Sequence, residues 1–194
     1  SASDGPENSF GRALYETETR QYNSALGYYD RAVESSGDTG LEKYYKAFYY
    51  MNRAVLRARM IEFISSIESN VQVLSMDDSG NTRARVRDQI THQYDYSEAI
   101  ADMKSAVETV PDMPYFHFNL GNLYCLSAEH ISSIESFTRA IELYPYMGDA
   151  YFNRGLVLIY LKDREKGCID LSRAGELGVQ EAYSVINKYC EEEN

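Results

Sequence analysis

The amino-acid sequence predicts an all-α fold in which antiparallel helix pairs stack into an α-solenoid. The hexapeptide Ile-Ser-Ser-Ile-Glu-Ser occurs at residues 64–69 and again at 131–136, 67 positions later, which is close to two repeats of about 34 residues. A segment that combines an aromatic residue with Asn lies upstream of each copy, within 50–54 and 116–121, and a third version lies within 151–155. Such a period is typical of stacked helix pairs.

The clearest unit runs from residue 114 to residue 145. Gly121 and Ser133 are small residues on its two expected helices, so the helices can approach each other closely. Tyr124 and Phe137 then fill the space around the crossing. Pro145 ends the second helix, because proline cannot continue the helical hydrogen bonding. The unit therefore has the residues that a compact α-hairpin needs.

This order of residues resembles the tetratricopeptide repeat, which places a large residue, Leu-Gly, Tyr, a small residue, Phe, Ala and Pro at fixed offsets. The unit that begins at Gly148 follows the same arrangement, with Arg154 at the position of the usual Leu. The resemblance implies one domain over residues 1–194, with about five helix pairs and a capping helix. The expected units are 8–36, 41–78, 80–111, 114–145 and 148–178, and the expected cap is 180–191.

The middle of the chain fits this pattern less well. In the 41–78 unit we expect a long first helix over about 41–59 and a second helix built on 64–70. The partner of the helix that precedes Pro111 should lie within 82–93. A β-hairpin or loop insertion near 71–87 competes with this assignment, because β-branched residues there are followed by turn formers. We favour helix, loop and helix, because the repeat register continues across the segment.

Composition excludes several classes of function. The 194 residues carry a net charge of −11 at pH 7, and an acidic surface repels phosphate backbones and anionic membranes, so we expect no nucleic-acid partner. No stretch is apolar enough to span a membrane. Residues 1–8 lack the basic and apolar regions of a signal peptide, and both the compartment and the oligomeric state stay open. A basic or neutral protein partner fits the charge best.

Few residues indicate chemistry. The three histidines are isolated from one another, and no metal-binding or phosphate-binding motif is present, so we expect no cofactor, no metal and no catalysis. The three cysteines have no paired metal spacing and are interpreted as buried free thiols. Arginines at 53, 57 and 59, with those at 83, 85 and 87, form the basic concentrations. They are interpreted as a solvated face, or as a surface that pairs with acidic residues of a neighbouring chain.

The family resemblance implies a concave groove lined by the first helix of each pair, which binds a peptide or protein. Asn52, Asn119 and Asn153 occupy one equivalent position, where a carboxamide can hold a peptide backbone. Alternatively, these Asn side chains hydrogen-bond locally between helices. Phe118 and Phe152 stand where a carboxylate-binding Lys would be needed, so we expect an apolar or basic ligand. The candidate groove residues are Asn52, Tyr115, Phe118, Asn119, Asn122, Asp149, Phe152, Asn153, Leu156 and Tyr160.

The sequence therefore predicts a non-catalytic adaptor that binds a protein or peptide in its concave groove. The last two units are similar to bacterial repeat proteins, which suggests a module of a larger bacterial protein. The alternative is a structural solenoid used for self-association or for docking against other parts of the same chain. An enzyme is the least favoured class, because fold alone does not specify activity and no catalytic arrangement is visible.

Overall fold

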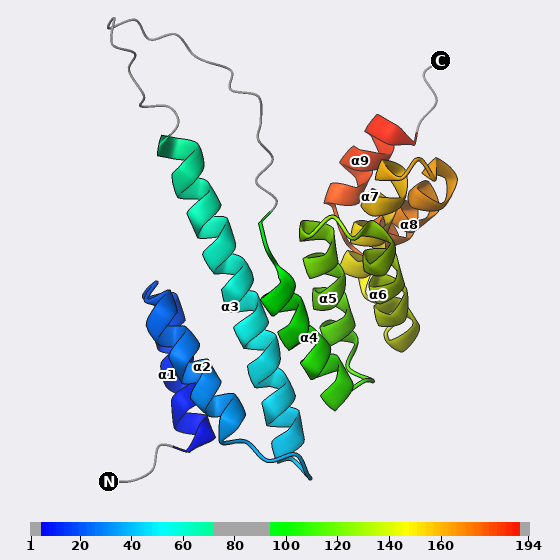
Figure 1. The fold of residues 1–194 in the computed structure, drawn as a ribbon. Coiled ribbons are helices and arrows are strands. Elements are labelled where there is room, and N and C mark those ends of the chain that lie inside the picture. Colours follow the sequence, from blue (N-terminus) through cyan, green and yellow to red (C-terminus); the bar gives the residue numbers. More distant parts are fainter. Residues whose placement is uncertain (1–4, 72–93, 191–194) are drawn as a thin grey trace, which may run out of the picture.

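The computed structural model describes residues 5–71 and 94–190, and within these residues the chain forms helices and no strands. Figure 1 shows them as a succession of helices laid side by side from one end of the molecule to the other. The helices are α1 (Pro6–Glu18), α2 (Tyr22–Glu34), α3 (Glu42–Val71), α4 (Ser97–Thr109), α5 (Pro114–Leu126), α6 (His130–Leu143), α7 (Gly148–Tyr160), α8 (Arg164–Glu176) and α9 (Glu181–Tyr189).

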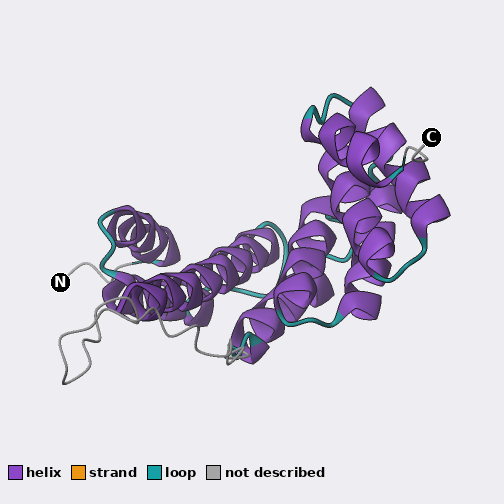
Figure 2. Cartoon of the chain, turned by 90° about the horizontal axis from the view of Figure 1, so that it is seen from above, coloured by secondary structure: helices purple, strands orange, loops and turns teal. Residues whose placement is uncertain are grey.

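The helices pack mainly against their neighbours in sequence. The described residues form four pairs, α1 with α2, α3 with α4, α5 with α6 and α7 with α8, and each pair contacts the next through adjoining helices. Helix α9 packs on α8 at the end of the stack. Figure 2 shows the same arrangement from above as an elongated, curved array. This architecture confirms the predicted all-α solenoid with a C-terminal capping helix.

The long helix α3 differs from the expected division into units 41–78 and 80–111. That division requires a turn between the helix over 41–59 and the helix built on 64–70, but α3 runs through both without a break. Helix α3 itself packs along α4. Among the described residues, one pair, α3 with α4, therefore occupies the region where the sequence suggested two. The segment 82–93, expected to hold the partner of α4, lies outside the described residues, as does most of the alternative hairpin near 71–87.

The reason for the unbroken helix is visible in the turns of the other pairs. Arg20, Ala128 and Lys162 adopt left-handed backbone conformations, with φ of 61°, 61° and 70°, at the turns that end α1, α5 and α7. The repeat register places Ile61 at the position that corresponds to Ala128. A β-branched residue strongly disfavours positive φ, and the surrounding sequence has no Gly or Pro. The helix therefore continues where the register expects a turn.

Glycines fix the close crossing of α7 and α8. A Cβ atom built on Gly167 would lie 2.9 Å from the carbonyl oxygen of Gly155 and 2.6 Å from Cγ1 of Ile159. In the preceding pair, a Cβ on Gly121 would lie 2.6 Å from Cε1 of Phe137. The small residues that the sequence assigned to the crossings therefore stand where the helices are closest.

Replacing Gly167 with Ala should destabilise the protein by about 1–3 kcal/mol, because the added methyl group must displace backbone atoms of α7. The matched control is Gly11→Ala in α1, where a Cβ meets nothing within 4 Å. There the higher helix propensity of Ala should stabilise by up to about 1 kcal/mol. Urea denaturation followed by circular dichroism measures both changes. Shifts of the same sign in the two variants would contradict the close crossing.

Two cysteines correct the prediction of three buried free thiols. Cys168 in α8 and Cys190, just after α9, form a disulfide, with 5.7 Å between their Cα atoms. Cys125 is free and half-buried. The pairing arises because α9 folds back along α8 and brings residues 22 positions apart into contact. Sequence spacing alone carries no signal of this approach. The disulfide ties the capping helix to the last pair.

Two arginines of α3 are held between helices, so they do not form the solvated face suggested by the sequence. Arg53 donates to Asp102 of α4 from Nε at 2.9 Å and from Nη2 at 2.6 Å, and its Nη1 donates to Asp30 of α2 at 2.7 Å. Arg57 also donates to Asp102. Arg59 is exposed, and the arginines at 83, 85 and 87 lie outside the described residues.

The same arrangement recurs in the last pair. Arg154 of α7 donates to Asp170 of α8 from Nε at 2.7 Å and from Nη2 at 2.8 Å, and its Nη1 donates to Thr138 of α6 at 2.9 Å. The hydrogen bonds to Asp170 raise the pKa of the Arg154 guanidinium, against the opposing effect of burial. In both cases an Arg on the first helix links its own second helix to the preceding one. These bridges fix how successive pairs stack.

Candidate functional site

Helices α5 and α7 present one continuous face each to the space between them. Along α5, residues 115, 118, 122 and 126 recur at steps of three or four, as do residues 149, 153, 156 and 160 along α7. This spacing places each set on a single helical face. The two helices contact each other directly. The expected groove residues of the last two pairs, except Asn119 and Phe152, therefore lie on a shared surface.

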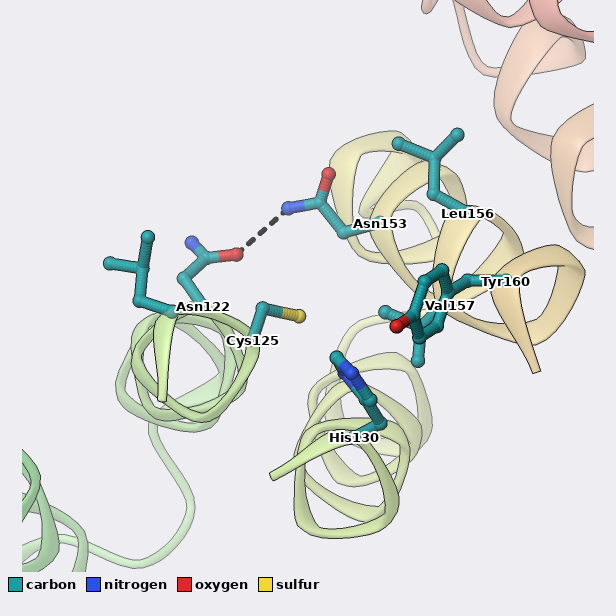
Figure 3. A pocket seen from close by; sticks show the side chains of 8 residues that line it. Asn122, Cys125, His130, Asn153, Leu156, Val157 and Tyr160 are labelled. Atoms are coloured by element: carbon teal, nitrogen blue, oxygen red, sulfur yellow. Dashed lines mark hydrogen bonds between the residues drawn. The ribbon is translucent and has the colours of Figure 1, made fainter. Parts of the chain in front are cut away.

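A first cavity of about 410 Å³ lies toward the C-terminal ends of α5 and α7, and we call it the apolar cavity. Figure 3 shows side chains from α5, from α7 and from the start of α6 converging on it. Most of its exposed wall is carbon and sulfur. It is lined by Asn122, Cys125, Leu126, His130, Asn153, Leu156, Val157 and Tyr160.

A hydrogen bond between two carboxamides crosses the rim of the apolar cavity. Nδ2 of Asn153 donates to Oδ1 of Asn122 over 2.8 Å, and this links α7 to α5 (Figure 3). Within the described residues, Nδ2 of Asn122 and Oδ1 of Asn153 have no hydrogen-bond partner. The pair therefore offers one donor group and one acceptor beside an apolar wall, which is the complement of a peptide unit.

One wall of the apolar cavity is formed by a thiol and by two aromatic rings in edge-to-face contact. Sγ of Cys125 lies 2.9 Å from the hydroxyl of the buried Ser133. Burial raises the pKa of the Cys125 thiol, with the hydrogen bond to Ser133 acting in the opposite direction, so the thiol stays protonated and apolar at neutral pH. The rings of His130 and Tyr160 meet edge to face, with centroids 4.8 Å apart. These groups favour an uncharged ligand group.

A second cavity, also of about 410 Å³, lies toward the N-terminal ends of the same two helices, and we call it the tyrosine cavity. Its walls come from α5, the connection between α6 and α7, the start of α7 and the turn between α8 and α9. Its surface is mostly polar. It is lined by Tyr115, Phe118, Tyr144, Tyr146, Met147, Gly148, Asp149, Leu177, Gly178, Val179 and Glu181.

The candidate residues thus divide into three groups. The apolar cavity gathers Asn122, Asn153, Leu156 and Tyr160, and the tyrosine cavity gathers Tyr115, Phe118 and Asp149. The remaining candidates, Asn52, Asn119 and Phe152, line neither cavity. Sequence reasoning missed His130, Tyr144, Tyr146 and Glu181 as cavity residues. They lie on second helices, connections or the cap, and the first-helix pattern carries no information about those elements.

The equivalent Asn residues use their donors in different ways. Nδ2 of Asn52 donates to the backbone oxygen of Phe48 over 2.7 Å, and Nδ2 of Asn119 donates to that of Tyr115 over 2.8 Å. Nδ2 of Asn153 donates across helices to Asn122 over 2.8 Å, and Nδ2 of Asn119 also donates to Sδ of Met51 in α3 over 3.8 Å. The alternative raised from the sequence, a hydrogen bond between helices, describes Asn153 and Asn119. The bonds of Asn52 and Asn119 to backbone oxygens stay within their own helices.

Two further arrangements were sought in the described parts of the chain. No group of three or more His, Cys, Asp or Glu side chains is placed to hold a metal ion between residues 5 and 71 or between 94 and 190. Over the same ranges, none of the helices combines the length and the apolar character that crossing a bilayer requires.

Comparison with known proteins agrees with this geometry. No protein-family model matches the chain. Among solved structures, a double mutant of MamA RS-1, a protein of the tetratricopeptide type, is 13% identical with a TM-score of 0.59 and covers 92% of this chain and 78% of its own. Another crystal structure of MamA is 14% identical with a TM-score of 0.59, covering 93% and 82%. The fold of this chain is therefore that of a tetratricopeptide-type helical solenoid.

Proposed function

We propose that this chain is a non-catalytic scaffold that binds a peptide segment of a partner protein in the groove between α5 and α7. The observation that carries the proposal is the apolar cavity, which consecutive helix pairs build on one shared face. Leu156 is 37% exposed and Tyr160 is 67% exposed there. Large apolar side chains left open to solvent beside a cavity are typical of ligand sites.

The cavity suits one apolar side chain of the bound segment. Burying a Leu, Met or Phe side chain contributes about 1.5–3 kcal/mol, which is enough to anchor an otherwise weak contact. Asn122 and Asn153 lie at the rim, where their available donor and acceptor can bind the backbone beside that anchor. The cavity would then recognise an apolar side chain of the bound peptide, and the two Asn carboxamides would bind the backbone of that peptide.

Replacing Leu156 with Glu should weaken peptide binding by at least about tenfold, because a charged group then lines the site that the apolar anchor enters. Peptides selected from a random displayed library on the whole chain supply the ligand, and isothermal titration calorimetry measures the dissociation constants. The matched control is Ile169→Glu on α8, which is 62% exposed and lines neither cavity. It should bind like the unmodified protein.

Two results would contradict this function. Selected peptides that bind equally well to the Leu156→Glu and Ile169→Glu variants would place recognition elsewhere. A concentration-dependent mass in light scattering that Leu156→Glu abolishes would instead assign the groove to a second copy of the chain, which is the self-association alternative.

A further inference from the structure

We infer that the tyrosine cavity binds a basic side chain, Arg or Lys, of the segment that occupies the groove. The inference rests on the proposed function, because both cavities open on the same face of α5 and α7. It assigns to the second cavity a ligand of a different chemistry from the first. Three properties carry it: aromatic walls, unpaired carboxylates and a floor of fixed shape.

The aromatic walls are formed by three solvent-exposed tyrosines that lie outside the buried core. Tyr115 is 56% exposed, Tyr144 is 43% exposed and Tyr146 is 67% exposed, and all three line the cavity. The rings of Tyr144 and Tyr146 have their centroids 6.1 Å apart, at an angle of 60°. Exposed tyrosine rings beside a cavity can offer a π face to a ligand, and such faces attract ammonium and guanidinium groups.

The charges of the cavity are negative. Asp149 and Glu181 are exposed, they line it together, and no Lys or Arg lines it. Within the described residues, neither carboxylate forms an ion pair, whereas Asp30, Asp102, Asp112, Asp163 and Asp170 each have a basic partner. A cation that enters would therefore meet two carboxylates without displacing an internal partner. The net charge of −11 adds attraction at longer range.

The floor of the cavity is held by tight backbone packing. A Cβ on Gly148 would lie 2.9 Å from Cγ2 of Val179 and 3.1 Å from Cβ of Leu177, so the start of α7 rests directly on the turn between α8 and α9. Gly178 in that turn has a φ of 97°, which glycine adopts without strain. The elements that carry Asp149 and Glu181 are thus positioned before a ligand arrives, which lowers the entropic cost of binding.

The two cavities also imply a spacing within the ligand. Tyr115 and Leu126 mark the two ends of the groove along α5, and 11 residues of helix span about 16 Å. An extended peptide rises about 3.3 Å per residue, so at most about five residues separate the cavities. Selected peptides should therefore carry a basic residue within about five positions of their apolar anchor.

The experiment uses a probe that carries no apolar anchor. Titration of the whole chain with the pentapeptide acetyl-Gly-Gly-Arg-Gly-Gly-amide, followed by NMR, should shift the backbone amides of Gly148, Asp149 and Val179. The neutral analogue, with citrulline in place of Arg, should bind at least about tenfold more weakly. Because the probe does not enter the apolar cavity, its failure would overturn this inference and leave the proposed function untouched.

Substitutions separate the cavity from the general charge of the surface. The double variant Asp149→Asn with Glu181→Gln should lose about tenfold in affinity, and Tyr146→Leu should lose about threefold. The matched control is Glu7→Gln with Glu165→Gln, since both are exposed acids in the first turn of a helix and neither lines the cavity. Equal binding of the citrulline peptide, an equal loss in the control, or an unchanged Tyr146→Leu variant would each overturn the inference.

Discussion

Replacing Asp102 with Ala should lower the free energy of unfolding by up to about 3–5 kcal/mol, because removing the buried carboxylate that two arginines share leaves each of them with one more exposed carboxylate. Asp102 accepts hydrogen bonds from Arg53 and Arg57, and its side chain is only 6% exposed. The two arginine side chains are 14% and 20% exposed. Water therefore cannot readily replace the lost carboxylate.

Asp112→Ala is the matched control for this prediction. Asp112 also pairs with an arginine, Arg139, at 3.4 Å, but its side chain is 80% exposed, and exposed pairs contribute about 1 kcal/mol or less. Urea denaturation of both variants, followed by circular dichroism, gives the comparison. If Asp102→Ala were no more destabilising than Asp112→Ala, the bridge from α3 to α4 would not contribute to the packing of this helix pair.

Breaking the disulfide between Cys168 and Cys190 should destabilise the protein by about 3 kcal/mol, as expected for a closed loop of this length. Helix α9 has nine residues and buries one of them fully, Ala182. A helix this short is marginal without tertiary anchoring. We therefore expect loss of the disulfide to release the cap first, with faster amide hydrogen exchange in α9 than in α7.

Two independent experiments test this prediction. One uses the double variant Cys168→Ser with Cys190→Ser, and the other treats the unmodified protein with reductant. Thermal denaturation of the unmodified protein should occur at a lower temperature in reductant, whereas that of the double variant should not respond to it. Cys125→Ser is the control for an unrelated cysteine and should keep the response, because Cys125 is free. If reductant left the melting temperature of the unmodified protein unchanged, the disulfide would not stabilise the fold as predicted.

The long helix α3 shows where the repeat pattern misleads. The two hexapeptide copies and the Asn residues upstream keep one register, since both pairs lie 67 positions apart. Asn52 and Asn119 even make the same hydrogen bond to the backbone four residues earlier. Yet the first hexapeptide ends α3 and the second lies in α6. Ile61 contributes to the difference, since a β-branched residue resists the positive φ that Ala128 adopts in the turn.

The sequence by itself determined the helical solenoid, because helix spacing, small residues at the crossings and turn residues are local properties that each segment carries alone. It also predicted one shared face on α5 and one on α7, since the residues of each face recur every three or four positions. Only the tertiary structure decided that Arg53 meets Asp102, that Cys168 meets Cys190 and that Glu181 joins Tyr146 around one cavity. Those contacts join separate elements, and their geometry depends on how the pairs stack.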